Sequence, residues 1–231
     1  MASCPNDDPR AGYATAAAAM VSLGLAVMVS AVLAWTLTNL RGARADLAKT
    51  QMAAQLEGGQ LLAAYGILEN SVPGRLTWTE SVVDTNLDIL AEPEADKVNA
   101  GTADEGLLRQ LGAETPTETT AWFQAQSLAP RPEVVREAQP GELWRECAPS
   151  ALSYYGRAAT AKIMAPHSPV RLGQRARAGE VWRVVVSANG WRDDRLVRIT
   201  GNGRRPAIVI DRRFDRGSVE GSLCSSLVAA Q

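Results

Sequence analysis

The chain is poor in the residues from which catalytic and metal sites are built. Its single histidine, His167, lies between prolines and has no GxSxG or comparable nucleophile context nearby. Its three cysteines form neither a CxxC pair nor a cysteine–histidine cluster with the ligand spacing of zinc. Carboxylates occur in pairs without any distinguishing context. The sequence therefore predicts no enzyme and no metal centre.

Charge is missing from one long stretch near the N-terminus, because no charged residue lies between Arg10 and Arg41. A helix needs about 20 predominantly apolar residues to cross a bilayer. Residues 13–40 exceed that length, and only Ser, Thr and Asn interrupt the apolar run. The sequence therefore predicts a transmembrane helix over residues 13–40.

Three interpretations of this span compete. A secretory signal peptide needs a positive n-region and a small-residue cleavage site. Here Asp7 and Asp8 offset Arg10, and the only tolerable site is Val32-Leu33-Ala34. An uncleaved signal anchor is the second interpretation. The basic residues just after the span would place the rest of such a protein in the cytoplasm by the positive-inside rule.

The third interpretation is a prepilin, in which a short polar leader ends in Gly and an aromatic residue opens the apolar helix. Gly12 would then be the last residue of a 1–12 leader, and Tyr13 the first residue of the mature chain. Most prepilins have Glu at the fifth mature position, where this chain has Ala17. Ala17, Ala18 and Gly24 are small enough to let neighbouring helices approach closely in lipid.

The remaining residues divide by charge into an acidic part, residues 91–150, and a basic part, residues 151–231. A basic region can indicate nucleic-acid binding. Its arginines, however, alternate with apolar residues at strand spacing, and only Trp182 and Trp191 are interleaved with them. We therefore expect a solvated strand face and no nucleic-acid partner. Cys147 and Cys224 are the only cysteines after the leader, and we expect them to form a disulfide in an exported domain.

Helical periodicity continues beyond the span, since apolar residues recur at sevens in Leu40, Leu47, Ala54, Leu61 and Leu68. This stripe predicts one helix to about Glu69 that covers a sheet, with Gly58-Gly59 loosening it. Short alternating runs over residues 75–90 indicate one or two strands, and a β meander is expected at about 180–211.

A small helical insert is expected at about 100–140. Thr102 with Glu105 fits a capping box at the start of its first helix, and Gly112 is placed to close that helix. Further helices are expected from about Thr117 to Leu128 and from Pro132 or Glu133 to Gln139. The fold class is thus α+β and pilin-like: a long N-terminal helix, transmembrane over 13–40 and continuing over 41–70, packed on an antiparallel sheet within a head of residues 71–231.

Two stretches in the middle of the chain resemble the K-type minor pseudopilin of type II secretion systems. The first is Asp96–Ala103 (DKVNAGTA) with the LLRQLG helix after it, and the second is Ser150–Arg157 (SALSYYGR). That family has a "KxNxNTA…LLxxL" stretch, whose second Asn is replaced here, and a "TVYSGR" stretch. The hairpin over 181–199 and the segment 206–213 follow in the same order.

The resemblance implies a subunit that starts and caps a short pseudopilus. It would be a single-pass protein of the bacterial inner membrane with a periplasmic head, and its partners would be other minor pseudopilins, the secretion platform and prepilin peptidase. K-type subunits lack the Glu that Ala17 replaces, which suits a subunit at the tip. Calcium is possible by the same resemblance, without assigned ligands; the acidic residues Glu92, Glu94, Asp96 and Asp104 are expected to form a hydrated loop. A type IV minor pilin and a membrane-anchored periplasmic binding module remain alternatives.

Overall fold

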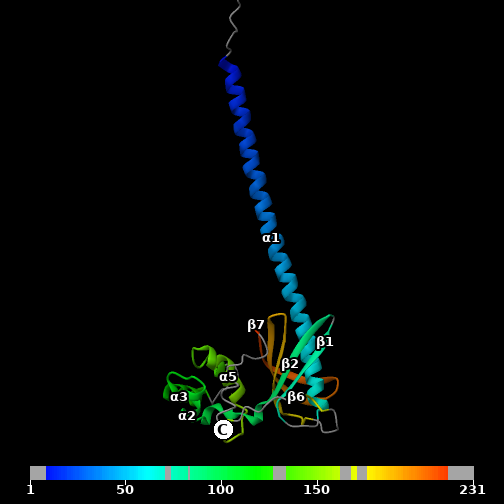
Figure 1. Cartoon of the computed structure of the whole chain (residues 1–231), viewed down its shortest axis with the longest axis vertical. Coiled ribbons are helices and arrows are strands. Elements are labelled where there is room, and N and C mark those ends of the chain that lie inside the picture. The colour runs from blue at the N-terminus through cyan, green and yellow to red at the C-terminus, as the bar shows by residue number, and fades with distance from the viewer. Residues whose placement is uncertain are drawn as a thin grey trace, which may run out of the picture. The chain divides into compact units, whose positions relative to one another are not determined.

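The computed structural model describes residues 9–70, 74–82, 84–126, 134–161, 168–170 and 176–217. The chain divides into two compact units, Met1–Gln51 and Met52–Gln231, and each is described here by itself. The fold is α+β, with a long apolar N-terminal helix and an antiparallel sheet (Figure 1).

Helix α1 runs from Pro9 to Glu69 without a break (Figure 1). Proline is well suited to the first helical position, because its missing N–H would have no partner there. The interior is rich in Ala, Leu and Met, which are strong helix formers. The N–H of Asn70 donates to the Ile67 carbonyl at 3.3 Å, and the helix ends near Glu69, where the sequence predicted its end.

Five strands form one antiparallel sheet in the order β1-β2-β5-β6-β7. The strands are β1 (Leu76–Val82), β2 (Thr85–Pro93), β5 (Val181–Ala188), β6 (Trp191–Asn202) and β7 (Arg205–Arg216). Asn189 and Gly190 join β5 to β6 with φ of 50° and 74°, the backbone of a tight hairpin turn. The predicted meander is confirmed, and the polar residues Arg192, Asp193 and Asp194, which have the character of a turn in the sequence, lie inside β6.

The last five turns of α1 cover one face of this sheet, and of the predicted stripe Leu68 is buried there, whereas Ala54 and Leu61 are exposed. Leu61 is 53% exposed, whereas Leu56, Ala63 and Ile67 are buried against the sheet. Two glycines determine which face of α1 packs on the sheet. A Cβ on Gly59 would lie 2.7 Å from Val186 Cγ1, and one on Gly66 would lie 2.9 Å from Trp78 Cζ2. Gly59 therefore does not loosen the helix; it allows the helix backbone to approach the sheet closely.

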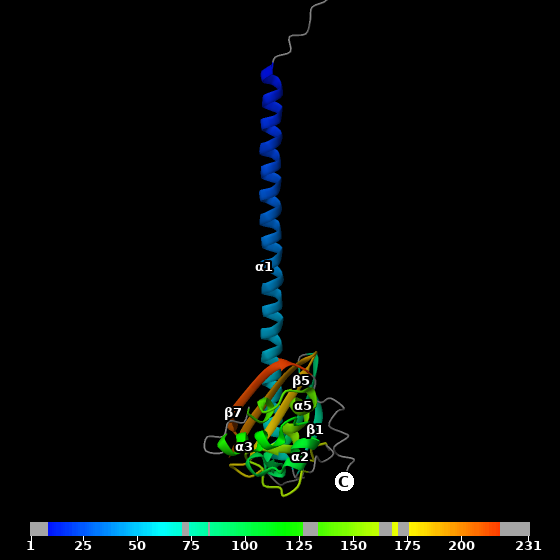
Figure 2. The same cartoon turned by 90° about the vertical axis from the view of Figure 1, so that its left-hand side faces the viewer.

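The insert between β2 and β5 lies on the other side of the sheet (Figures 1 and 2). It comprises η1 (Glu94–Asp96), β3 (Val98–Asn99), η2 (Ala100–Thr102), α2 (Glu105–Gln110), α3 (Pro116–Gln126), α4 (Val134–Glu137), α5 (Glu142–Ala151) and β4 (Leu152–Ser153). Its helices therefore extend to Ala151, beyond the expected end near residue 140. Trp144, Phe123 and Leu108 are fully buried in a core of its own.

Local signals in the insert identified the helices better than their caps. Asp104, not Thr102, caps α2, because its carboxylate accepts the Leu107 N–H at 2.7 Å. Gly112 has φ of 89° directly after α2, as expected for a helix-closing glycine. Helix α5 was not predicted, since Pro149 within it reads as a helix breaker. The expected helix limits at Leu128, Pro132 and Glu133 lie outside the described residues.

Candidate functional site

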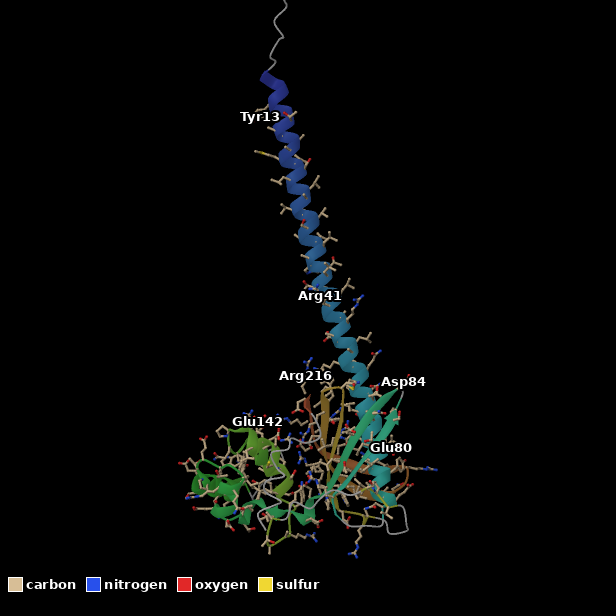
Figure 3. All side chains as sticks on the ribbon, in the orientation of Figure 1. Tyr13, Arg41, Glu80, Asp84, Glu142 and Arg216 are labelled. Carbon is tan, nitrogen blue, oxygen red and sulfur yellow. The ribbon has the colours of Figure 1, made fainter. Side chains whose placement is uncertain are left out.

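The first unit of the chain presents an apolar helix whose side chains are exposed in the part of the chain that the structure describes. One helix in the described residues is long and apolar enough to cross a membrane, with a mean hydropathy of 2.3 in its most apolar window. Leu25, Leu33 and Leu37 are all more than half exposed. Figure 3 shows side chains projecting on all sides of α1 between Tyr13 and Arg41.

The hydroxyl groups in this stretch are satisfied within the helix itself. Ser22 and Ser30 donate to the carbonyls of Ala18 and Ala26 at 2.9 and 2.8 Å. Thr36 donates in the same way to the carbonyl of Val32 at 2.7 Å. Unsatisfied polar groups are costly in hydrocarbon, so these bonds adapt the helix to a bilayer.

The residues predicted to form a cleavage junction and a helix contact all lie in this helix. The bond between Gly12 and Tyr13 falls in the first turns of α1, and Tyr13 is 82% exposed. Ala17 and Gly24 are seven residues apart and therefore share one side of the helix. Ala17 and Ala18 are exposed, and a Cβ on Gly24 would have nothing within 4 Å.

Cys147 lies on α5, fully buried in the core of the insert, and is disulfide-bonded. Cys224, its predicted partner, lies outside the described residues, as do Cys4 and His167. The pairing of Cys147 with Cys224 stays a prediction.

The two sequence stretches that carry the family resemblance lie side by side in the structure. Strand β3, in the first stretch, pairs in parallel with β4, in the second. Asn99 Nδ2 donates to the Tyr154 carbonyl at 3.2 Å, and the Arg157 N–H donates to the Ala95 carbonyl at 3.0 Å. A Cβ on Gly156 would lie 2.3 Å from the Lys97 carbonyl oxygen, so only glycine fits the site.

The solvated strand face expected for the arginines is wrong for Arg183 and Arg195, which are each 5% exposed, and buried charges on the insert side of the sheet were not predicted. Glu92 is 4% exposed and pairs with Arg75 at 2.9 Å, Lys97 at 3.2 Å and Arg183 at 3.4 Å. Burial opposes its ionisation, but these three cations outweigh burial and hold the pKa of Glu92 below its ordinary value. Glu94 is also buried and pairs with Lys97. The expected hydrated acidic loop is therefore wrong for these two residues.

Asp194 of β6 accepts hydrogen bonds from arginines of three elements, α4, β5 and β6 itself. Arg183 of β5 binds it with two hydrogen bonds, of 3.0 and 2.8 Å. Arg136 of α4 donates to its Oδ2 at 2.6 Å, and Arg192 does so at 3.1 Å. Burial alone would raise the pKa of Asp194, but the arginines hold it well below its ordinary value. Burial and the charge of Arg183 lower the pKa of Arg136 to about 10 in spite of Asp194.

A second ion network lies on the opposite face of the sheet, beside α1. Asp193 is fully buried and accepts hydrogen bonds from Arg195 at 2.6 Å and Arg212 at 3.1 Å. Arg195 also pairs with Glu57 of α1 at 2.6 Å. Neighbouring residues of β6 thus join the sheet to the insert on one face and to α1 on the other.

A cavity of about 810 Å³ lies between the insert and the sheet. Arg136, Arg145 and Tyr154 line it from the insert, and Arg183 and Leu196 line it from the sheet. Burial raises the pKa of Tyr154 to about 12, and its hydroxyl is buried without a hydrogen-bond partner among the described residues. Sequence reasoning had no signal for this cavity, because its walls are distant in the chain. Within the described residues no group of three or more His, Cys, Asp or Glu could hold a metal ion.

No family model, curated protein or solved structure matches this chain.

Proposed function

We propose that the protein is a minor pseudopilin of a type II secretion system, with a pilin-like fold, anchored in the bacterial inner membrane with its head in the periplasm. It acts by assembly and has no catalytic role. It starts and caps a short pseudopilus that supports the export of folded proteins across the outer membrane.

The observation that carries this proposal is that the two parts of α1 have different surroundings: the first part is exposed and the last turns pack on the sheet. Its first part is apolar and exposed, with its hydroxyls satisfied internally, as a helix in lipid requires. Its last turns are buried on an antiparallel sheet through Leu56, Ala63 and Ile67. A helix that is half anchor and half core is the pilin layout.

The insert and the small residues of α1 support the more specific role. The paired stretches around Asn99 and Tyr154 are those that resemble the K-type family. Ala17, where other pilins have Glu, avoids burying a carboxylate in lipid, which costs roughly 2.5 to 3.5 kcal/mol on insertion scales. A subunit without this acid needs no neighbour ahead of it, which fits the tip.

Cleavage by prepilin peptidase is the first test. The intact mass of the protein extracted from membranes should correspond to a chain that begins at Tyr13. A chain that still begins at Met1 would favour a membrane-anchored binding module, the alternative that the cavity of about 810 Å³ supports. A chain that begins near Trp35 would indicate a secretory signal. Either result contradicts the proposal.

Deletion of the gene is the second test. The exported enzymes should remain active in the periplasm while their secretion stops. Normal secretion in the deletion strain, or recovery of this protein in stoichiometric amounts along the filament, would exclude a tip-initiating role. Assembly of type IV pili should be unchanged, and its loss would point instead to a minor pilin.

A further inference from the structure

The two edges of the five-stranded sheet differ in how well they are protected against a further strand. An edge strand leaves one row of backbone N–H and C=O groups unpaired, and proteins usually protect such a row with prolines, bulges or side chains. Pro206 of β7 offers no N–H, and the pairing of β7 with β6 shifts register between Leu196 and Val197. The Arg212 N–H donates to Asp211 Oδ1 at 2.8 Å. The β7 edge is therefore protected along much of its length.

Strand β1, at the other edge, has none of these protections. Its residues, Leu76–Val82, contain no proline, lysine or arginine, and they pair with β2 in unbroken register. Among the described residues no backbone hydrogen bond joins β1 to any segment besides β2. Thr, Trp and Val, which make up much of β1, favour strands. The β1 edge is thus open to an extended peptide that adds as a further strand.

A groove of about 460 Å³ lies beside this open edge, between β1 and the last turns of α1. Trp78 and Glu80 line it from β1, and Leu62 and Tyr65 line it from α1. Leu62 and Tyr65 are 40% and 41% exposed. The Tyr65 hydroxyl donates to the Gly203 carbonyl at 2.8 Å, which holds the ring in place. Because side chains alternate between the faces of a sheet, every second residue of an added strand would point toward this groove.

The groove is lined by carboxylates without a balancing cation. Glu69 and Glu80 line it, and among the described residues no lysine or arginine does. The β1–β2 hairpin adds Asp84 and Asp88. Glu80 and Asp84 lie on the side of the head away from the insert (Figure 3). A cationic side chain is the electrostatic complement of this groove, and over Trp78 it also gains a cation–π attraction.

A second copy of this chain does not fit the open edge. Antiparallel pairing of β1 with β1 of another copy would set two acidic edges against each other, and like charges on facing strands are destabilising. Pairing with β7 of another copy would meet the protections of that edge. The occupant that fits is a different protein with an extended, basic segment.

We propose that β1 accepts an extended, basic segment of a partner protein as a sixth strand of the sheet. One lysine or arginine side chain of that segment lies in the groove, over the rings of Trp78 and Tyr65 and beside the carboxylate of Glu80. The inference goes beyond the proposed function and does not rest on it, since it uses only the sheet edge and the groove.

Fluorescence anisotropy with the full chain in a non-ionic detergent tests the edge. The probe is a rhodamine-labelled peptide of sequence TVTRTVT, which has the length of β1 and places arginine and two valines on one face. Peptide TVTETVT is the charge control. Peptide TPTRPVT is the backbone control, because its two prolines stand at positions of opposite alternation and at least one removes an N–H that would face β1.

The arginine peptide should bind about tenfold more tightly than either control, because the first control opposes the carboxylates and the second loses a hydrogen bond of the strand ladder. No binding of the arginine peptide, or equal binding of all three peptides, would overturn the proposal.

Hydrogen exchange shows where the peptide binds. The arginine peptide should slow the exchange of amides in β1, since an added strand bonds to the N–H groups of that edge. Amides of β7 should exchange at their former rate. Protection of β7 in place of β1, or of neither strand, contradicts the proposal.

Substitutions assign the binding to the groove. Glu80→Gln should weaken binding of the arginine peptide about threefold and Glu80→Lys about tenfold, because the first loses an ion pair and the second introduces repulsion. Trp78→Leu should weaken it about threefold through the lost cation–π contact. Glu118→Gln, at an exposed position of α3 that does not line the groove, should bind as the unmodified protein does. Unchanged binding in Glu80→Lys contradicts the proposal even where Trp78→Leu fails to fold.

Sedimentation of the full chain in the same detergent distinguishes a partner from a second copy. Without peptide the protein should stay monomeric. Concentration-dependent self-association that Glu80→Lys abolishes would assign the β1 edge to a second copy, against the proposal.

Discussion

At the scale of single residues, two adjacent glycines of α1 have opposite surroundings. Gly59→Ala would place a methyl group 2.7 Å from Val186 Cγ1 and 2.8 Å from Leu87 Cδ1. Overpacking of this kind costs about 1 to 3 kcal/mol, which exceeds the helix-propensity gain of about 1 kcal/mol. We expect a lower free energy of unfolding in denaturant titrations.

Gly58→Ala is the matched control, because a Cβ there has nothing within 4 Å. It should raise the free energy of unfolding by up to about 1 kcal/mol. Equal stabilisation by the two substitutions would mean that α1 does not pack on the sheet through Gly59.

A second residue-scale prediction concerns Asp194. Removing one partner of a buried ion pair leaves an uncompensated charge, at a cost of about 3 to 5 kcal/mol. Asp194→Asn should therefore destabilise the protein by that amount at pH 7, because it leaves Arg136 and Arg183 without their shared carboxylate. Asp88→Asn, on the exposed face of β2, should change the free energy of unfolding by less than about 0.5 kcal/mol.

The pH dependence of stability follows from the same carboxylates. The pKa values of Asp194 and Glu92 are lower in the folded chain than in the unfolded one. Their ionised forms therefore contribute stability above the unfolded pKa near 4, and that contribution is lost as the pH falls toward the folded values. In unfolding titrations below about pH 4, the stability difference between the protein and Asp194→Asn should shrink. A constant difference would contradict the ionised state of Asp194.

At the scale of elements, the type of each element was more predictable than its buried face. Local patterns gave α1 to Glu69, the alternating strands and the glycine after α2. They failed where a distant partner decides: Leu61 belongs to the predicted seven-residue stripe but is exposed, and the sheet contacts Leu56 and Ile67 because Gly59 and Gly66 lie on that side.

Buried charge was unpredictable for the same reason. In the sequence, Asp193 and Asp194 have the character of turn residues, because adjacent carboxylates are rarely buried. Their burial depends, besides the nearby Arg195, on arginines from β5, β7 and the insert, which no local window contains. Cys147 could be named as a disulfide candidate from cysteine count alone, whereas the cavity between the insert and the sheet required the fold.

The exposed, apolar first part of α1 allows a prediction about helix association. Gly24→Leu should weaken co-purification of the protein with the proposed partners, other minor pseudopilins, from detergent extracts, because a large side chain holds the helices apart. Ala18→Leu should act similarly, and Ala17→Glu should have little effect at a tip. Gly42→Leu, at an equally open position just beyond the apolar span, is the control. Equal losses with Gly24→Leu and Gly42→Leu would contradict a contact within the membrane.

At the scale of the whole molecule, part of α1 belongs to the head. A chain that begins at residue 45 retains Leu56, Ile67 and Leu68, and should unfold cooperatively in circular-dichroism melts. A chain that begins at residue 71 loses them. Each buried aliphatic side chain contributes about 1.5 to 3 kcal/mol, so the loss approaches the total stability of about 5 to 15 kcal/mol of an ordinary domain. Cooperative unfolding of the shorter chain would show that the sheet is stable alone.

Two neighbouring strands of the sheet, β2 and β5, are separated in the chain by the whole insert. Strand β2 pairs with β5, so Pro93 opposes Trp182 across the whole insert. Closing a loop of roughly 90 residues is entropically costly and slow compared with hairpin formation. Strands β1 and β2 can cover part of the apolar face of α1 early, but the part that packs on β5 and β6 stays uncovered until the last third of the chain has been synthesised. The newly made protein is most vulnerable to aggregation and proteolysis in that interval, and a chaperone would have most effect there.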